Sequence, residues 1–485
     1  MRILTGEQIK EADRYTIENE PISSIDLMER ASTAIAQWID SNTDKNKSLL
    51  FLIGKGNNGG DGLAVARILY HTGYNCSIYL PFEKDQLSED CLYNLNRLPT
   101  GVNRVEDLDN ISSNTFIVDA LLGTGVKGKL KEPLLSIIEK VNILNNKVIS
   151  IDLPSGMMTE FGNNGQKIIK ADITLTLQFP KLAMLLPEAG EYCGEIEILP
   201  IGLSKNYINS SSTSFHYITK TLINNTIIKR AKFGHKGTFG HALLICGSKG
   251  MGGAAALSTG AALRSGCGLV TLHTPDRERF ATQTNYPSAM LSLDSDDYFS
   301  ELPADLPKYT AIGIGCGLNQ MPRTIDAFKQ LLVSVNKPMV IDADALNIIS
   351  NHYKLRYHIP ENSILTPHPG ELRRLVGDWD NEKHKLELVR RLASSLKSIV
   401  IVKGAHTMVC LPDGSCYFNS TGNSGMAKGG SGDVLTGYIT GLLARGHNST
   451  EASFIGVYNH GLAGDKAAMK HGMESMNSKD LIDEL

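Results

Sequence analysis

The sequence predicts two consecutive α/β domains, each built on a mostly parallel sheet, and three observations support this. The chain has 485 residues, which is too long for one hydrophobic core, because domains usually hold ~100–200 residues. Short continuous apolar runs alternate with helical segments, as expected for strands that are buried on both faces. The alternation stops at a Ser/Thr-rich stretch, residues 203–215, and then restarts. We interpret that stretch as a linker and place the domains at residues 1–215 and 216–485.

The first half opens with a helical segment over residues 5–40, for which Thr5 is the expected N-terminal cap. A further helix is expected over residues 63–73. Strands are expected over the apolar runs 48–54, 76–81, 115–123, 148–154 and 172–179. A strand, a glycine-rich turn and a helix in succession are typical of a doubly wound sheet, which binds ligands at the carboxyl ends of its strands.

The second half repeats this alternation. Strands are expected over residues 241–247, 268–275, 310–317, 338–346 and 363–370, and two more around a Pro-Asp-Gly turn within 399–419. Helices are expected over residues 252–266, 432–445 and 450–471. The high glycine content, 46 residues, suits the many tight turns of such a fold.

Composition excludes several classes of function. The net charge is −3, which gives no reason to expect nucleic acid or an anionic membrane as a partner. The N-terminus lacks the apolar segment of a signal peptide, and no stretch approaches the ~20 apolar residues of a membrane span. The eight cysteines are scattered without a C-x-x-C pair. We therefore expect reduced thiols and a cytoplasmic location.

The stretch "GKGNNGGDG", residues 54–62, lies between an expected strand and an expected helix. Glycines let the backbone approach a phosphate closely, and a helix N-terminus offers N–H donors. The stretch matches neither a Walker A loop nor G-x-G-x-x-G, so a simple tight turn is the alternative. Asn57, Asn58 and Asp61 favour a binding site, because a turn alone does not need three polar side chains.

Two later strand ends add oxygen ligands, with Asp119 in "IVDALLGTG" and Ser155 in "IDLPSG". Together with Asn58 they offer one carboxylate and several neutral oxygens. Such a low ligand charge suits a monovalent cation such as K⁺ better than Ca²⁺ or Zn²⁺. The alternative is that Asp119 only caps the turn that follows it.

In this order, "GKGNNGGDG", "VDALLGTG" and "DLPSG" resemble the NAD(P)H-hydrate epimerase (YjeF N-terminal) family over residues 1–215. The resemblance implies a Rossmann-like three-layer domain that interconverts the R and S epimers of hydrated NADH and NADPH. It implies K⁺ binding by Asn58, Asp119 and Ser155, and a catalytic and binding role for Asp152. It also implies that the hydrate is held by Asn57, Asn58, Gly59, Gly60, Asp61, Gly123, Thr124, Gly125, Val126, Lys127, Gly128, Lys129 and Asp152. Ser32 departs from the family, which usually has glycine there.

A second glycine-rich turn, "GGSGDVLTG" at residues 429–437, opens the expected helix near the C-terminus. Its backbone N–H groups suit a phosphate or a developing oxyanion. Asp433 lies at the helix start, and the alternative is an aspartate that only complements the helix dipole.

The "GSGD" sequence resembles the anion hole of the ribokinase superfamily. With "GIGCGL", "IDADALN", "TPHPGE" and "VKGAHT", it resembles the ADP/ATP-dependent NAD(P)H-hydrate dehydratase family over about residues 225–485. The resemblance implies a ribokinase-like α/β fold and Asp433 as catalytic base. It implies hydrate binding by Ala254, Gly317, His368 and Asp433. It implies nucleotide binding by Lys403, Gly404, Ala405, His406, Thr407 and Gly432, with Mg²⁺ accompanying ADP and Glu371 as a candidate ligand. Lys428 departs from the family, where a small or hydroxyl residue is common.

Together the two resemblances imply a bifunctional repair enzyme whose small-molecule substrates are hydrated NADH and NADPH (NADHX and NADPHX) and ADP. The hydroxyl at C6 of the S epimer would be phosphorylated, and loss of phosphate would restore NAD(P)H, with AMP as the second product. We also expect a homo-oligomer. Two alternatives are a small-molecule kinase that releases a stable phosphorylated product, and a non-catalytic dinucleotide-binding module.

Overall fold

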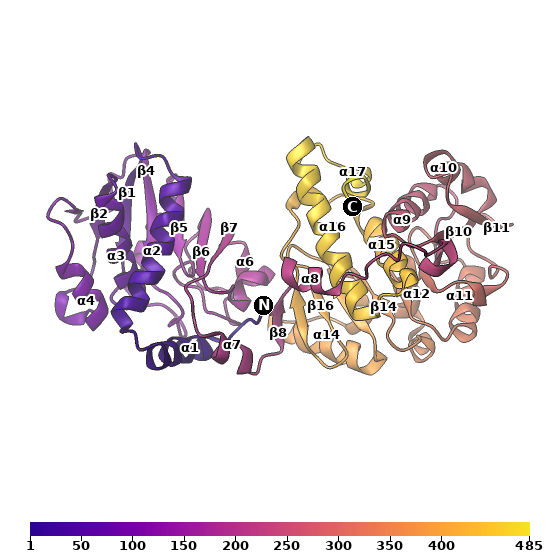
Figure 1. The fold of residues 1–485 in the computed structure, drawn as a ribbon, viewed down its shortest axis with the longest axis horizontal. Coiled ribbons are helices and arrows are strands. Elements are labelled where there is room, and N and C mark those ends of the chain that lie inside the picture. Colours follow the sequence, from indigo (N-terminus) through magenta and orange to yellow (C-terminus); the bar gives the residue numbers. More distant parts are fainter. The chain divides into compact units, whose positions relative to one another are not determined.

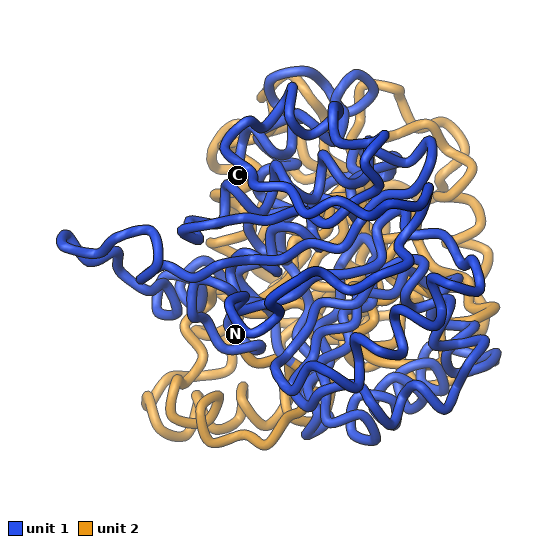
Figure 2. The backbone as a smooth tube through the Cα atoms, turned by 90° about the vertical axis from the view of Figure 1, so that its right-hand side faces the viewer, with its two compact units in different colours: residues 1, 216–485 blue, residues 2–215 orange.

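The computed structural model describes residues 1–485, which divide into two compact units. Residues 2–215 form one unit, and residues 216–485 with Met1 form the other (Figure 2). Each unit contains its own sheet and its own hydrophobic core. None of the helices combines the length and the apolar character that a membrane crossing requires. All eight cysteines are free thiols.

Residues 2–215 are built on seven parallel strands in the order β3-β2-β1-β4-β5-β6-β7 (Figure 1). The strands are β1 (Ser48–Ile53), β2 (Asn75–Tyr79), β3 (Asn103–Arg104), β4 (Thr115–Ala120), β5 (Val148–Ile151), β6 (Ile173–Leu177) and β7 (Glu195–Leu199). The helices are α1 (Gly6–Asn19), α2 (Ser24–Asn42), α3 (Asn57–His71), α4 (Glu89–Asn96), α5 (Leu134–Ile143), α6 (Pro187–Gly190) and α7 (Lys205–Ser210).

Side chains of β1 alternate between the two faces of this sheet. Leu49, Phe51 and Ile53 join one core cluster with residues of α2 and α3, whereas Leu50 and Leu52 join another with residues of α5. Both sets are almost completely buried. A strand that is covered on both faces has no polar side, which explains the continuous apolar runs of the sequence.

Three expectations for this half need adjustment. The helical segment 5–40 is two helices, although Thr5 is the cap, with its hydroxyl accepting from the Gln8 backbone N–H. The helix expected from residue 63 begins at Asn57, so the polar residues of the glycine-rich stretch lie in its first turns. The linker interpretation of residues 203–215 is wrong in part. Lys205–Ser210 form α7, which packs on α1 through hydrogen bonds from Ser204 and Tyr207, whereas the boundary between the two units falls at the end of the stretch, after Phe215.

Residues 216–485 contain most of a ten-stranded sheet in the order β11-β10-β9-β12-β13-β14-β15-β16-β17-β8. The strands are β8 (Phe215–Tyr217), β9 (His241–Ile245), β10 (Leu269–Pro275), β11 (Met290–Asp294), β12 (Ala311–Ile314), β13 (Met339–Ile341), β14 (Ile364–Leu365), β15 (Ile399–Val402), β16 (Met408–Cys410) and β17 (Cys416–Phe418). The helices are α8 (Lys220–Thr226), α9 (Gly252–Arg264), α10 (Arg279–Asn285), α11 (Pro322–Ser334), α12 (Ala343–Asn351), α13 (Pro369–Val376), α14 (Glu382–Leu396), α15 (Ser431–Arg445), α16 (Ser449–His471) and α17 (Ser478–Glu484).

Three expectations for this half are wrong in part. The run 338–346 is a strand only as far as Ile341, and its polar second half enters α12. The run 363–370 is a strand only over Ile364–Leu365, and α13 begins at Pro369. Residues 399–419 form three strands rather than two, because the polar turn 403–407 separates β15 from β16. The Pro-Asp-Gly turn joins β16 to β17 as expected.

Candidate functional sites

The carboxyl ends of β1, β4, β5 and β6 open onto a cavity of about 720 Å³ within residues 2–215. The strand order reverses direction between β1 and β4, which is where ligands bind in open α/β sheets. Eight predicted site residues line this cavity: Asn57, Asn58, Asp61, Gly123, Thr124, Gly125, Val126 and Asp152. The other five, Gly59, Gly60, Lys127, Gly128 and Lys129, are not among the lining residues.

Gly59 has a packing role that explains its residue type. A Cβ at this position would lie 2.0 Å from the carbonyl oxygen of Gly54, so only glycine lets α3 start this close to the end of β1. The carbonyl and amide groups around the turn can then face the cavity.

Two of the predicted cation ligands, Asn58 and Ser155, meet at the carbonyl oxygen of Leu122, and Ser155 connects them to the third, Asp119. Asn58 Nδ2 lies 3.0 Å from this oxygen and Ser155 Oγ lies 3.3 Å from it. The Asp119 carboxylate is completely buried and accepts a hydrogen bond of 2.5 Å from Ser155 Oγ. Ser155 N and Ser150 Oγ each donate to it at 2.8 Å. Burial raises the pKa of Asp119, and these donors oppose the shift.

This donor set fits a monovalent cation. It contains one carboxylate, hydroxyl and amide groups and a backbone carbonyl, all oxygen ligands except the Asn58 amide nitrogen. The nitrogen and oxygen of an asparagine amide exchange places when the group is turned over. No group of three or more His, Cys, Asp or Glu side chains is arranged to hold a metal ion, so the site lacks the donors that transition metals prefer.

A buried ion pair between Asp152 and Lys181 forms one wall of the cavity. The Lys181 side chain is only 1% exposed, and its ammonium group also donates to Thr176 Oγ1 at 2.9 Å. Asp152 adopts a left-handed backbone conformation, with φ of 66°, directly after β5. Such a conformation is uncommon outside glycine and is maintained by the surrounding contacts, here the Leu177 N–H that donates to the Asp152 carboxylate at 3.2 Å.

Two further carboxyl groups, Asp13 and Asp61, line the same cavity. Burial, reinforced by the negative charge of Asp152 and opposed by Lys181, raises the pKa of Asp13 to about 7. Burial, followed by the charges of Asp152 and Asp13, raises the pKa of Asp61 well above its ordinary value. Lys181 pairs with Asp152, and Lys10, Arg14 and Lys55 also line the cavity. Burial therefore disfavours the charged forms of Asp13 and Asp61 although basic side chains are present.

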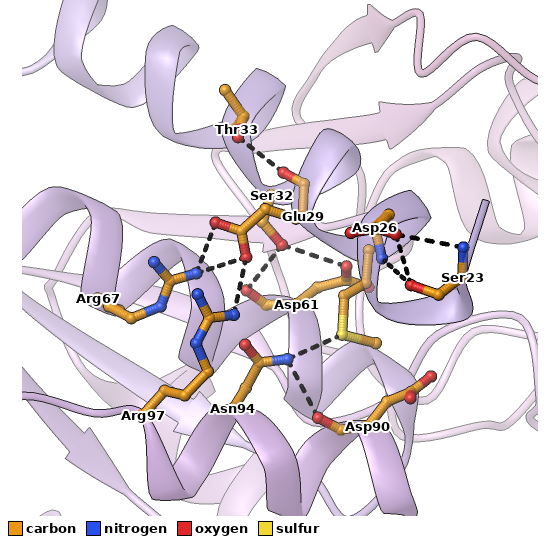
Figure 3. A network of polar contacts seen from close by, with 11 residues as sticks. Ser23, Asp26, Glu29, Ser32, Thr33, Asp61, Arg67, Asp90, Asn94 and Arg97 are labelled. Atoms are coloured by element: carbon orange, nitrogen blue, oxygen red, sulfur yellow. Dashed lines mark hydrogen bonds and ion pairs between the residues drawn. The ribbon is translucent and has the colours of Figure 1, made fainter.

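Ser32, which replaces the glycine usual in the family, lies against Asp61. Its hydroxyl is 3.4 Å from both the backbone oxygen and a carboxylate oxygen of Asp61 (Figure 3). On the neighbouring turn of α2, Glu29 pairs with Arg67 of α3 at 2.6 Å and with Arg97 at 3.4 Å. These contacts fix α2 against α3, so the serine is accommodated without opening the helix pair.

In residues 216–485, the second glycine-rich turn places Asp433 in the first turn of α15. Gly430 caps this helix in a left-handed conformation, with φ of 91°. Burial raises the pKa of Asp433 to about 6, and a hydrogen bond from Cys316 opposes the shift. An aspartate with a pKa near 6 is ionised at neutral pH and is basic enough to accept a proton.

A network of charged side chains surrounds Asp433 at the carboxyl ends of β13 and β15. Lys403 Nζ lies 2.8 Å from Asp342 Oδ1 and 3.8 Å from Glu371 Oε2. Thr436 Oγ1, one turn after Asp433, donates to Asp342 Oδ2 at 2.7 Å. Burial alone would lower the pKa of Lys403, but the two carboxylates outweigh it and raise the pKa. The lysine therefore stays charged and holds a positive centre beside Asp433.

The other predicted residues of this unit occupy the same edge of the sheet. His368 caps α13, and its Nδ1 accepts from the N–H groups of Gly370 and Glu371 at 3.0 and 3.3 Å. Gly317 has φ of 61°, and a Cβ there would lie 3.2 Å from Ala254 Cβ, so these two predicted residues are neighbours. A Cβ on Gly432 would lie 3.3 Å from Lys403 Nζ, which links the glycine turn to the lysine.

Residues 403–407 form the turn between β15 and β16. Gly404 N–H donates to Thr407 Oγ1 at 3.3 Å, and Gly404 and Ala405 are exposed. His406 Nδ1 lies 3.1 Å from the Asn419 carbonyl, and burial lowers the pKa of His406. The imidazole is thus neutral at physiological pH and acts as a hydrogen-bond donor to this carbonyl.

Lys428, the departure noted in the sequence, reaches away from this turn. Its ammonium group donates to the backbone oxygens of Glu474 and Met476 at 2.6 Å each and to Met473 at 3.3 Å. It therefore closes the loop that precedes α17. Lys428 thus connects the glycine turn to the C-terminal segment.

Sequence reasoning did not identify Asp13, Lys181, Asp342 or Thr436 as site residues. Lys181 follows β6 and Asp342 follows β13, so the rule that ligands bind at the carboxyl ends of strands could have found both. Asp13 and Thr436 lie within helices and carry no comparable signal.

Comparison with protein-family models gives two matches in succession. A model described as YjeF-related protein N-terminus matches residues 24–183, and a model described as NAD(P)H-hydrate dehydratase matches residues 242–485. Curated relatives match the whole chain. The bifunctional NAD(P)H-hydrate repair enzyme Nnr of Moorella thermoacetica is 33% identical over 100% of this chain and 96% of its own. The bifunctional NAD(P)H-hydrate repair enzyme Nnr of Escherichia coli is 30% identical, and the match covers 99% of this chain and 92% of the relative.

Solved structures resemble the second unit. A ribokinase-like superfamily protein of Enterococcus faecalis is 26% identical, covers 56% of this chain and 94% of its own, and has a TM-score of 0.50. A second structure is an ADP/ATP-dependent NAD(P)H-hydrate dehydratase of Bacillus subtilis that was co-crystallised with ATP and Mg²⁺. It is 32% identical, covers 56% of this chain and 95% of its own, and has a TM-score of 0.48. The predicted ribokinase-like fold of this half is confirmed.

Proposed function

The chain belongs to the family of bifunctional NAD(P)H-hydrate repair enzymes, and we propose that its two units carry out the two steps in turn. The first unit interconverts the R and S hydrates, and the second dehydrates the S hydrate at the expense of ADP. The observation that carries the proposal is the pairing of two separate sites. A cavity lined by Asp152 and Lys181 lies in one unit, and an acidic helix start at Asp433 lies in the other.

In the second unit, Asp433 accepts the proton of the C6 hydroxyl as the oxygen attacks the terminal phosphoryl group of the nucleotide. The N–H groups at the start of α15 stabilise the charge on the transferring group. Lys403, held by Asp342 and Glu371, neutralises negative charge of the nucleotide. Loss of phosphate from C6 together with a proton from C5 then restores the ring double bond of NAD(P)H.

Ala254, Gly317 and His368 form the side of this site that faces the hydrate, and residues 403–407 with Gly432 form the side that faces the nucleotide. Mg²⁺ supplies charge neutralisation on the phosphates and is brought largely by the nucleotide, as Mg²⁺ commonly keeps few protein ligands. The carboxylate of Glu371 accepts from the His368 N–H at 2.8 Å and lies near Lys403, so it can offer at most one oxygen to the ion.

In the first unit, the turn after β1 and residues 123–126 hold the dinucleotide hydrate, and Asp152 lies at the reacting ring. Asn58, Asp119 and Ser155 would hold K⁺, and the ion would supply positive charge toward a dinucleotide bound in the cavity. The helix N-terminus contributes further N–H donors for the same phosphates.

The phosphoryl donor is ADP rather than ATP, as expected for fused two-domain forms. The test uses the full chain with chemically hydrated NADH. Initial rates of NADH formation, read at its absorbance band, are compared at saturating ADP and ATP, and AMP and phosphate are quantified. Faster turnover with ATP would overturn the donor assignment. A stable phosphorylated product without NADH would instead indicate a small-molecule kinase, and no reaction with either nucleotide would favour a binding module.

A further inference from the structure

The wall of the first cavity contains an acidic side chain that the proposed mechanism leaves unused. Asp13 lies on α1 and lines the cavity together with Asp61, Asp152 and Lys181. Unlike Asp152, which is held by Lys181 and by the Leu177 N–H, Asp13 has no hydrogen bond among the influences on its ionisation. The Asp13 carboxyl oxygens therefore remain available to exchange a proton with a bound molecule.

A partly buried carboxyl group without a hydrogen bond is costly to maintain, because its charged form loses hydration without gaining a partner. A structural role would normally bring a capping or ion-pair contact. Thr16 and Glu11, on the same helix, both have such contacts, to Ser204 and Tyr207 respectively. Asp13 alone among these faces the cavity. This contrast indicates a role toward the ligand.

We propose that Asp13 is a second catalytic residue of the epimerase site. It donates a proton to the C6 hydroxyl when water leaves and takes a proton back when water adds. This inference rests on the proposed function of the first unit. In the forward step the Asp13 carboxylic acid gives its proton to the hydroxyl oxygen, and the C6–O bond breaks. The electron pair leaves with oxygen as water, and the ring nitrogen lone pair delocalises the positive charge left at C6.

The return step restores the same atoms. A water molecule adds to the opposite face of C6, and its surplus proton passes to the Asp13 carboxylate, so the enzyme regains its starting form. No oxidant, reductant or further reactant is needed. The product is the other epimer, and the exchanged oxygen comes from solvent.

The charges around the cavity favour this route. A cationic ring is stabilised by negative groups that are already in place, and Asp152 provides one that Lys181 orients. Asp61 is buried against the Ser32 hydroxyl, and this burial raises its pKa well above the ordinary value, which disfavours a second negative charge there. Ring opening between C6 and the ring nitrogen would create no cation, and the Asp152 carboxylate would give it no such advantage.

The ionisation of Asp13 matches the task, because its pKa of about 7 leaves acid and base forms both populated at neutral pH. The α2 residues that line the cavity, Ser24, Leu27, Met28 and Ala31, are uncharged. The titratable and charged groups that face Asp13 across or around the cavity are Lys10, Arg14, Glu18, Lys55, Asp61, Asp152 and Lys181.

The experiment follows epimerisation in the full chain without nucleotide, so that dehydration is idle. Purified R hydrate is incubated with enzyme, and the two epimers are separated by chromatography at intervals. Asp13→Asn should lower the epimerisation rate by roughly 10²–10⁴, the usual contribution of a positioned acid–base group. Asp13→Glu should recover part of it. Glu11→Gln, on the same helix but facing Tyr207, is the matched control and should leave the rate unchanged.

The pH profile and an isotope measurement separate a chemical role from a structural one. The wild-type rate should fall as the pH rises through about 7, where Asp13 loses its proton, and this limb should be absent in Asp13→Asn. In ¹⁸O-water, each epimerisation should introduce one labelled oxygen at C6. Dehydration of S hydrate by Asp13→Asn, measured after ADP is added, reports that the second unit is folded, and urea unfolding of the variant reports on the first unit.

Each outcome has a distinct meaning. Absence of epimerisation in the wild-type protein would overturn the proposed function of the first unit. Epimerisation by Asp13→Asn at the wild-type rate would overturn the role of Asp13 alone. Equal loss of epimerisation and dehydration in the variant would also count against it, as would epimerisation without ¹⁸O uptake.

Discussion

Replacement of Asp433 by asparagine separates catalysis from folding in the second unit. The amide keeps the shape of the side chain but cannot accept the hydroxyl proton. Loss of a general base is expected to lower the dehydration rate by roughly 10²–10⁴. Nucleotide binding should survive, because the N–H groups at the start of α15 are backbone groups and Lys403 is retained.

The pKa of Asp433 also predicts the pH dependence of the wild-type enzyme. Burial raises this pKa from 3.8 to about 6, and the base acts only when ionised. With that pKa, about nine-tenths of the molecules carry the charge at pH 7 and about one-tenth at pH 5. The dehydration rate should therefore fall about tenfold between these values as the pH is lowered, and this limb should disappear in Asp433→Asn.

The same raised pKa also affects stability: the charge on Asp433 that activity requires lowers the free energy of unfolding. Because the folded-state pKa is raised, ionised Asp433 destabilises the native unit, and the cost is complete above about pH 6. A shift of about two pKa units corresponds to about 3 kcal/mol. Asp433→Asn should raise the free energy of unfolding at pH 7 by up to this amount. The advantage should shrink as the pH falls from about 6 toward 3.8.

Three measurements test this reasoning: initial rates with S hydrate and ADP, calorimetric titration of ADP, and thermal unfolding. Asp326→Asn makes the same chemical change on the exposed face of α11 and is the matched control. Near wild-type turnover in Asp433→Asn would remove this residue from the mechanism. An inactive variant that is also less stable than wild type would refute the assignment of burial as the cause of the raised pKa.

Two predictions concern the first unit. Asp119→Ala should abolish epimerisation while dehydration of S hydrate is retained, and exchange of K⁺ for tetramethylammonium should have the same selective effect. Both rates are measured on one preparation, and loss of the two activities together would contradict independent sites. Lys181→Met should leave Asp152 as an unpaired buried carboxylate, so the first unit should lose about 3–5 kcal/mol of stability, as is usual when one partner of a buried pair is removed. Lys181→Met with Asp152→Asn should recover most of that loss in urea unfolding without restoring epimerisation, whereas a double variant as unstable as the single one would disprove the coupling.

Local sequence patterns predict much of this architecture. The elements that they did not predict depend on tertiary packing. Strand positions followed from continuous apolar runs because both faces of each sheet are covered. The start of α3 was missed because a glycine-rich sequence has low helix propensity, yet Gly59 is required where α3 meets Gly54. The helix α7 was taken for a linker because its few apolar residues gain their packing from α1.

The site residues divide in the same way. Asn58, Asp119 and Ser155 could be grouped from sequence because each stands at a strand end, where the sheet brings neighbouring ends together. Lys403 and Asp342 also follow strands, and the pairing of β13, β14 and β15 brings those strand ends near each other. The rule does not say which charged side chains then pair, so this ion pair follows only from the side-chain contacts. Asp13 depended on which face of α1 meets the cavity, which only tertiary packing decides.

The two sites share one arrangement of charge and apply it to different chemistry. In the first cavity the buried Lys181 pairs with Asp152, and Asp13 and Asp61 lie on the same wall. In the second unit Lys403 pairs with Asp342 and Glu371 beside Asp433. There the N–H groups at the start of α15 add donors that suit a phosphoryl group with its negative oxygens. Epimerisation needs no such transfer, so the two reactions are carried by two sites, and a chain that has both can act on the whole mixture of epimers.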